Sequence, residues 1–96
     1  MTGEVKVLVP TLLHPFVGGV DELRLEVGES ATVEEVLDAI KVEFPVFDRR
    51  LRDETGALRR YVNIYLGHDE VRRLDGLKTR VAAGSELMVV QSVAGG

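Results

Sequence analysis

The hydrophobic period of this chain changes twice, and that change restricts the fold more than any other feature of the sequence. Residues 4–9 carry a valine at every second position, and residues 21–27 alternate again, with Leu23, Leu25 and Val27 on one side. A two-residue period is that of a β-strand with one apolar face. We therefore expect two strands here, joined by a loop with glycine and proline that is longer than a tight hairpin turn.

A helical period begins after Thr32. Thr32 and Glu35 match a capping box, in which the hydroxyl accepts a backbone N–H three residues on and the glutamate reaches back. Apolar residues then recur at helical spacing, and Pro45 ends the pattern. The apolar stripe consists of Val33, Val36, Leu37, Ile40 and Phe44. This pattern predicts one amphipathic helix over residues 33–44.

The alternating period returns in the second half of the chain. Residues 46–60 are charged and irregular, which favours a short helical turn and then a loop. Strands are expected over 61–66 and 86–91, with a short strand near 71–73 between them. This order places one helix against one face of a mixed sheet, because neither can bury its apolar side alone. With the first and last strands as a parallel central pair, the predicted class is α+β, a ubiquitin-like β-grasp fold of four or five strands packed on one main helix.

Length and composition narrow the possible functions. A chain of 96 residues fits one domain, which we expect over residues 1–91, followed by a flexible tail over 92–96. The net charge of −4 argues against a nucleic-acid partner, since phosphate binding needs a basic face. The lack of cysteine excludes disulfides, thiolate metal sites and cysteine nucleophiles. Without a signal-like start or a membrane-length apolar run, we expect no membrane partner and a cytoplasmic location.

The end of the sequence is the candidate chemical site. Small residues dominate it, in the order Ser92, Val93, Ala94, Gly95 and Gly96. Glycine has no Cβ, so another protein and a nucleotide can approach it closely, and five extended residues reach up to about 17 Å. Attack of the ionised terminal carboxylate on the α-phosphate of ATP would give an acyl adenylate, which sulfide or a persulfide could convert to a thiocarboxylate. The alternative is an inert, frayed end.

A second candidate site lies on the sheet face away from the helix. Four apolar residues are expected to point outward there, with nothing in the chain to cover them: Leu8, Tyr65, Met88 and Val90. An apolar patch beside a tail is what docking to a partner enzyme requires. The alternative is a set of scattered surface hydrophobic residues.

Other chemistry-bearing residues are weaker candidates. His14 and His68 are far apart in the sequence, which favours surface histidines over a metal pair, and no metal site is expected. Arginines in residues 49–60 stand among acidic residues, which favours a mixed, solvated face over a docking patch for an acidic partner. Residues 76–79 resemble the end of a P-loop but lack its earlier part, so any ATP must sit on a partner protein.

The chain resembles a known family in several segments. The predicted β-grasp order and the ending Val-Ala-Gly-Gly at residues 93–96 resemble the ThiS and MoaD sulfur carriers. Residues 61–66 (Tyr-Val-Asn-Ile-Tyr-Leu), residues 69–72 after them, the opening at 9–13 and the turn at 76–77 look most like the CysO branch, which carries sulfur for cysteine formation. Nearly the whole chain takes part in the resemblance.

This resemblance implies a carrier that is not an enzyme and binds no cofactor itself. An E1-like enzyme would adenylate Gly96 with ATP, and a sulfur source would convert it to a thiocarboxylate. A PLP-dependent cysteine synthase or another biosynthetic enzyme would then use the sulfur, and in the cysteine branch a JAMM-type metalloprotease would release the product. Gln91 and Ser92 stand where many MoaD-type carriers have apolar residues or proline, which leaves the receiving pathway open. Two other classes also remain open: a ubiquitin-like modifier joined to lysines through Gly96, and a β-grasp binding module with an inert tail.

Overall fold

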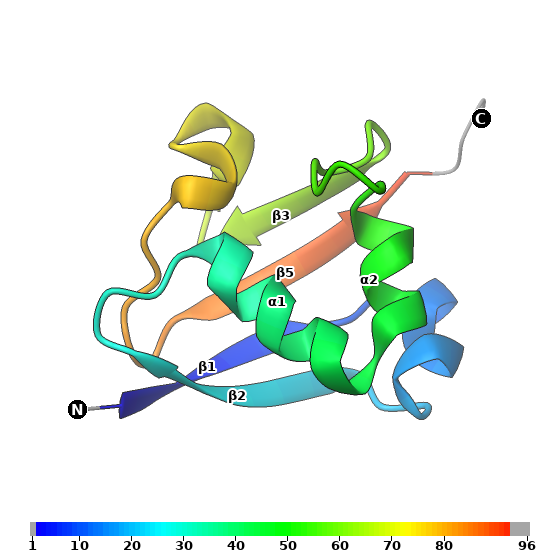
Figure 1. The fold of residues 1–96 in the computed structure, drawn as a ribbon, viewed down its shortest axis with the longest axis horizontal. Helices are drawn as coiled ribbons and strands as arrows, with labels where there is room; N and C mark the ends of the chain where they lie inside the picture. The colour runs from blue at the N-terminus through cyan, green and yellow to red at the C-terminus, as the bar shows by residue number, and fades with distance from the viewer. Residues whose placement is uncertain (1, 93–96) are drawn as a thin grey trace.

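The computed structural model describes residues 2–92, which form one mixed β-sheet covered on one face by helices (Figure 1). Among these residues the strands are β1 (Thr2–Leu8), β2 (Glu22–Gly28), β3 (Val62–Leu66), β4 (Asp69–Glu70) and β5 (Glu86–Gln91). The helices are α1 (Val33–Glu43) and α2 (Pro45–Leu51), with 3-10 helices η1 (Thr11–Val17), η2 (Val71–Arg73) and η3 (Gly76–Lys78). Within the described chain, no helix has both the length and the apolar character needed to span a bilayer.

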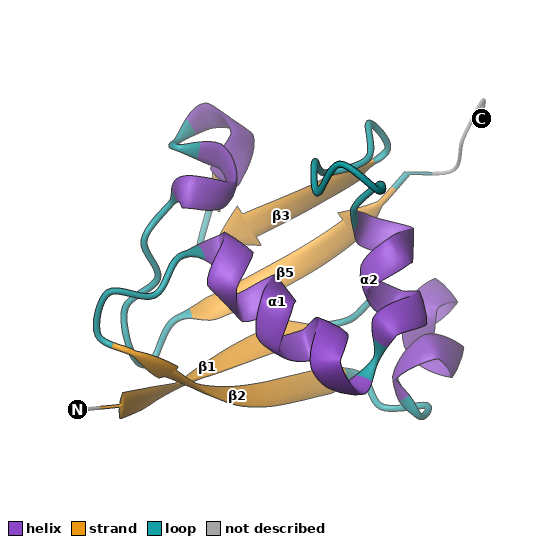
Figure 2. Ribbon diagram, in the orientation of Figure 1, coloured by secondary structure: helices purple, strands orange, loops and turns teal. Residues whose placement is uncertain are grey.

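The strands lie side by side in the order β2-β1-β5-β3-β4 (Figure 2). The central pair, β1 and β5, is parallel, and Leu8 lies opposite Met88 in it. All the other pairs are antiparallel. Strands from the two ends of the sequence can pair in parallel because the chain between them crosses over through α1 on one face of the sheet. The predicted α+β class and β-grasp arrangement are confirmed, with five strands in the sheet.

Helix α1 begins at its capping box. The Thr32 hydroxyl accepts a hydrogen bond from the backbone N–H of Glu35 at 3.2 Å. The helix ends at Glu43, one residue earlier than the sequence predicts, because Phe44 caps it and Pro45 starts α2. A proline suits the first position of a helix, where its missing N–H is not needed. The side chains that α1 buries are Val33, Val36, Leu37 and Ile40.

The face of the sheet under α1, which we call the inner face, forms the centre of the core. Six of its side chains are at most 2% exposed: Val5, Val7, Val62, Ile64, Leu87 and Val89. These are the residues that the alternating pattern predicts to face the helix. Full burial of each contributes about 1.5–3 kcal/mol, so the packing free energy is concentrated on this side of the sheet. The opposite side, the outer face, carries no helix in the described part of the chain (Figure 1).

The connection after β1 is helical, whereas the sequence predicts a loop. Residues 11–17 form η1, which contains Pro15. The ring of His14 makes a hydrogen bond between Nε2 and the carbonyl oxygen of Val9, at 2.9 Å. A 3-10 helix has three residues per turn and is usually too short to show that period, so alternation and α-helical spacing both miss it.

The short strand of the second half lies two residues earlier than predicted. We expected it near residues 71–73, and it is β4, at Asp69–Glu70. Gly67 adopts a φ of +63°, which allows a two-residue turn that brings Asp69 opposite Leu66. Val71 then turns inward and is fully buried in η2, so the segment cannot continue along the sheet edge.

Candidate functional site

The predicted tail leaves the domain beside the start of β3. Ser92, the last described residue, is exposed, and its N–H donates to the carbonyl oxygen of Tyr61 at 2.8 Å. Gln91 before it still pairs with Val62, and its buried Oε1 atom accepts no hydrogen bond from the described residues. The other predicted tail residues lie outside the described part of the chain: Val93, Ala94, Gly95 and Gly96. The structure therefore fixes the root of the tail, at Ser92.

The four predicted docking residues come together on the outer face. Met88 on β5 lies opposite Leu8 on β1 and opposite Tyr65 on β3. Val90 follows two residues along β5, so it shares their face of the sheet. Met88 is 41% exposed, and the other three are half-buried. We call these four residues the docking patch; it ends two residues before the tail root.

A shallow hollow of about 310 Å³ lies at the edge of the docking patch. Its lining is mostly apolar and comes from the ends of β1 and β5: Leu8, Val9, Pro10, Met88, Val89, Val90 and Gln91. Pro10 lies outside the four residues that the alternating pattern predicts for this surface. The sequence spacing could have predicted this position for Pro10. It follows Leu8 by two residues, so in an extended segment the two side chains face the same way. The hollow extends the docking patch toward the tail root.

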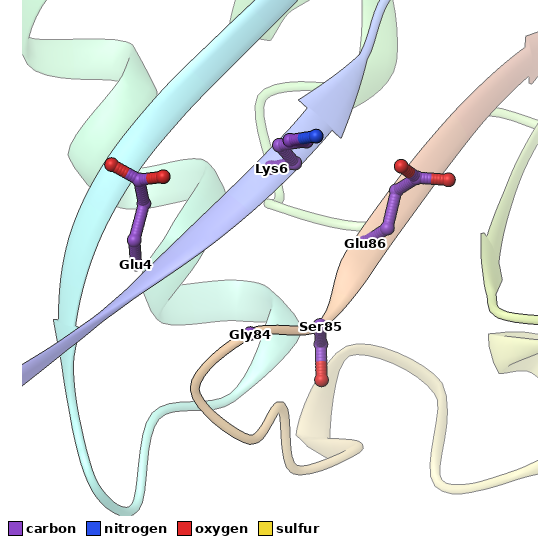
Figure 3. A pocket seen from close by; sticks show the side chains of 5 residues that line it. All are labelled: Glu4, Lys6, Gly84, Ser85 and Glu86. Atoms are coloured by element: carbon purple, nitrogen blue, oxygen red, sulfur yellow. The ribbon is translucent and has the colours of Figure 1, made fainter.

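The other end of the outer face is charged. A second hollow, of about 270 Å³, is lined by Glu4, Lys6, Gly84, Ser85 and Glu86, and Figure 3 shows the Lys6 side chain between those of Glu4 and Glu86. Lys6 and Glu86 are register partners on β1 and β5. Charged side chains in such an open position remain hydrated, so this end of the face offers no apolar contact to a partner.

The edge strand β2 carries an ion pair on the outer face of the sheet. On β2, the Nε–H of Arg24 donates to Glu22 Oε2 at 2.7 Å. This hydrogen bond is the main reason that the pKa of Glu22 lies below its usual value. Both groups are at the surface, so the pair adds little to stability.

The arginine-rich segment is not uniformly solvated, contrary to the prediction. Arg52 and Asp48 are both buried, with Arg52 Nε 2.8 Å from Asp48 Oδ1. Arg52 Nη2 also donates to Asp38 Oδ1 at 2.9 Å. A charged pair is tolerated in a core when hydrogen bonds satisfy it. The bond to Asp38 links the end of α2 to α1. For Arg52 and Asp48 the prediction of a solvated face is therefore wrong.

The histidine and carboxylate side chains of residues 2–92 do not gather into a metal site. No cluster of three or more histidine, cysteine, aspartate or glutamate side chains suited to a metal occurs there. His14 makes its hydrogen bond to Val9 within η1, whereas His68 is exposed in the turn before β4. The described side chains that gather at the tail root therefore offer contact surface and charge.

Comparisons with known proteins agree with this geometry. Residues 7–96 match the sequence model of the ThiS family. The chain is 33% identical over 94 residues to the sulfur carrier protein CysO of Mycobacterium tuberculosis, and the alignment covers 96% of this chain and 98% of that protein. The match is to a protein of nearly the same length, so it concerns the whole domain.

Solved structures are similar over the same range. A chain in the crystal structure of the Amycolatopsis orientalis BexX/CysO complex has a TM-score of 0.82 and 33% identity, covering 96% of this chain and 99% of that chain. The solution structure of small archaeal modifier protein 1 from Methanosarcina acetivorans has a TM-score of 0.79 and 28% identity, covering 100% of this chain and 99% of that chain. The two neighbours share a fold and carry different functional names.

Proposed function

This chain belongs to the ThiS family, and on that premise we propose that it is a sulfur carrier protein whose Gly96 carboxylate receives the sulfur. The observation that carries the proposal is the match to the sulfur carrier CysO over 96% of this chain. The family match extends through Gly95 and Gly96. The chain is therefore a carrier rather than an enzyme, and the chemistry is done on it by partners.

The proposed reaction has two steps. A carboxylate oxygen of Gly96 attacks the α-phosphorus of ATP, pyrophosphate leaves, and an acyl adenylate forms. Hydrosulfide then attacks the acyl carbon, AMP leaves with the electron pair of the broken C–O bond, and loss of the sulfur-bound proton leaves a thiocarboxylate. ATP is held by the activating partner in this scheme, and the carrier binds no cofactor of its own.

The chain works with partner enzymes, and the relative named in the BexX/CysO complex is itself bound to another protein. The partners we propose are an E1-like adenylating enzyme and a sulfur-accepting synthase, either a PLP-dependent cysteine synthase or another biosynthetic enzyme. A JAMM-type metalloprotease completes the scheme in the cysteine branch. A cytoplasmic location, where ATP is available to the activating enzyme, belongs to the same proposal.

The docking patch supports this function, because its apolar surface lies next to the tail root. We expect Met88→Asp to raise the KM for the carrier in the adenylation reaction by about 10-fold or more, since a charge would be desolvated in the interface. Circular dichroism and the thermal midpoint should stay close to those of the wild type, because the Met88 side chain is 41% exposed. A Met88→Asp chain that is adenylated as efficiently as the wild type would remove the patch from the proposal.

The main test adds one alanine after Gly96. The chain, its E1-like enzyme, ATP and a sulfur source are incubated together, and the carrier is measured by intact-mass analysis. The wild type should gain the mass of one oxygen exchanged for sulfur, and the extended chain should show no exchange. A matched control places the additional alanine after Met1, at the other end of the chain, and should react normally. Sulfur loading of the extended chain would refute the proposal.

The second candidate is a protein modifier, which the similarity to small archaeal modifier protein 1 at 28% identity favours. The same incubation separates the two functions. Conjugates of this chain with larger proteins would indicate the modifier, and a thiocarboxylate without conjugates would indicate the carrier. An unchanged mass under all conditions would leave a binding module with an inert tail.

A further inference from the structure

We propose that four arginines at the tail root form a docking element for an acidic protein surface on the activating partner. They are Arg49, Arg59, Arg60 and Arg72, and we call them the cationic rim. The inference rests on the proposed function, because it concerns the partner that receives the tail. It adds a second, electrostatic part to a recognition surface that the docking patch alone would leave purely apolar.

Hydrogen bonds hold two of the four rim guanidinium groups at the tail root, those of Arg59 and Arg72. The Nε–H of Arg59 donates to the carbonyl oxygen of Arg49 at 2.7 Å, and Arg72 Nη2 donates to the carbonyl oxygen of Arg59 at 2.7 Å. That same carbonyl also accepts the N–H of Val62, at 3.0 Å. Ser92 bonds to Tyr61, between Arg59 and Val62 in sequence. These bonds thus join α2, the approach to β3 and η2 at the tail root, and Arg60 is the residue directly before Tyr61.

The rim also borders the docking patch. Arg72 Nη1 donates to Oδ1 of Asn63, which is the cross-strand partner of Val90. Asn63 alternates with the buried Val62 and Ile64 along β3, so it faces outward. A partner that covers Val90 and takes the tail beyond Ser92 therefore meets the Arg72 guanidinium as well.

Within the described chain, the acidic residues of this segment form no ion pair with the rim arginines. Asp48 is buried against Arg52. The Oδ1 atom of Asp53 accepts hydrogen bonds from the N–H of Thr55 at 2.8 Å and of Ala57 at 3.3 Å. The Thr55 hydroxyl is the largest cause of the lowered pKa of Asp53, and Arg59 is the smallest. Within residues 2–92, none of the four rim arginines forms an ion pair.

The distribution of charge identifies the class of partner. The rim is cationic, but Glu4 and Glu86 stand at the far end of the same outer face, and the whole chain has a net charge of −4. A polyanion such as nucleic acid, which needs a broad basic surface, would be repelled by that end. A protein surface with carboxylates confined to the mouth of its tail channel fits both the sign and the small extent of the rim. Guanidinium groups can bind such carboxylates in pairs of hydrogen bonds.

The test is a double charge reversal, Arg49→Glu with Arg60→Glu, at two exposed side chains that make no hydrogen bond with the described residues. The control is Lys41→Glu with Arg80→Glu, which changes the net charge equally at two other exposed positions, in α1 and beside its N-terminal Thr32. Adenylation by the E1-like enzyme is followed as pyrophosphate release, at several salt concentrations. Thermal unfolding of each variant checks that it remains folded.

We expect the rim variant to raise the KM for the carrier by roughly 3- to 10-fold at low ionic strength with kcat nearly unchanged, since charges at the edge of an interface act mainly on encounter. The difference from the control should shrink at high salt. A KM and a salt profile equal to those of the control would overturn the inference while leaving the carrier function intact. So would a raised KM for ATP with an unchanged KM for the carrier, because the rim would then bind the nucleotide. A wild-type chain that releases no pyrophosphate would overturn the proposed function and this inference together.

Discussion

The two faces of the sheet are built from the same strands, but the inner face buries its apolar residues and the outer face leaves its own accessible to water. On β5, Leu87 and Val89 point to the inner face and are at most 2% exposed, whereas Met88 and Val90 point to the outer face and remain accessible. The inner residues lose their contact with water when the chain folds. The outer ones would lose it only when a partner binds. Neighbouring residues of one strand thus separate stability from recognition.

The largest expected effect tests this division on β5 itself. Leu87→Ala should lower the free energy of unfolding by about 3 kcal/mol, because it leaves a cavity under α1. Met88→Ala, one residue away, should change it by only about 0.5 kcal/mol. Urea denaturation of the two variants measures both values. Equal losses would show that the outer face also contributes to the core.

A smaller effect is expected from two glycines at neighbouring strand ends. Gly3 lies on β1 at a position that faces the inner side of the sheet, and a Cβ there would lie 2.1 Å from the Cβ of Ala83. Gly3→Ala should therefore cost about 1–2 kcal/mol of unfolding free energy through overpacking. Gly28 lies on β2 at a position that faces the outer side of the sheet, and a Cβ there would have no neighbouring heavy atom of the described residues within 4 Å. Gly28→Ala should be neutral or slightly stabilising by thermal unfolding, and a loss as large as that of Gly3→Ala would contradict the division.

The smallest effect concerns the ion pair of the outer face. Arg24→Gln should raise the pKa of Glu22 toward its ordinary value of about 4.3, because it removes the hydrogen bond that lowers it. A carboxylate with a lowered pKa in the folded state adds stability above that ordinary value and loses it as the pH falls through the folded-state pKa. NMR titration of the Glu22 carboxyl in the wild type and the variant measures the shift. An unchanged pKa would remove Arg24 as its cause, and stability at neutral pH should hardly change in either case.

Much of the fold was predictable because its signals are local. The capping box at Thr32, the apolar stripe and Pro45 placed α1 to within one residue, and alternation gave the bounds of β5, Glu86–Gln91. The docking patch followed from the same alternation, once β1 and β5 were taken as the central pair. These predictions depend on a period or on a single residue of special geometry, and both can be read from the sequence.

The errors lie where distant contacts decide the structure. The sequence predicts Arg52 at a solvated surface, but it is buried and bonds to Asp38 on α1 and Asp48 on α2. Nothing within one helical turn of Arg52 could reveal the contact with Asp38, fourteen residues away in the sequence. The predicted arginine cluster of residues 49–60 lacks Arg72 for the same reason, since Arg72 joins Arg59 only after β3 and η2 have folded together. The predicted chemistry of Gly96 lies outside the described residues and stays a prediction.

The rim contains only guanidinium groups, although the chain also has three lysines elsewhere. Four residues span at most about 14 Å, so an acyl group at Gly96 stays tethered within that distance of Ser92. A lysine near the tail root would present a small fraction of free amine, and amines attack acyl adenylates to form amides. Arginine stays protonated at neutral pH and is therefore a poor nucleophile. In the proposed reaction, the rim would therefore attract carboxylates without supplying an amine that the activated Gly96 could acylate before sulfur arrives.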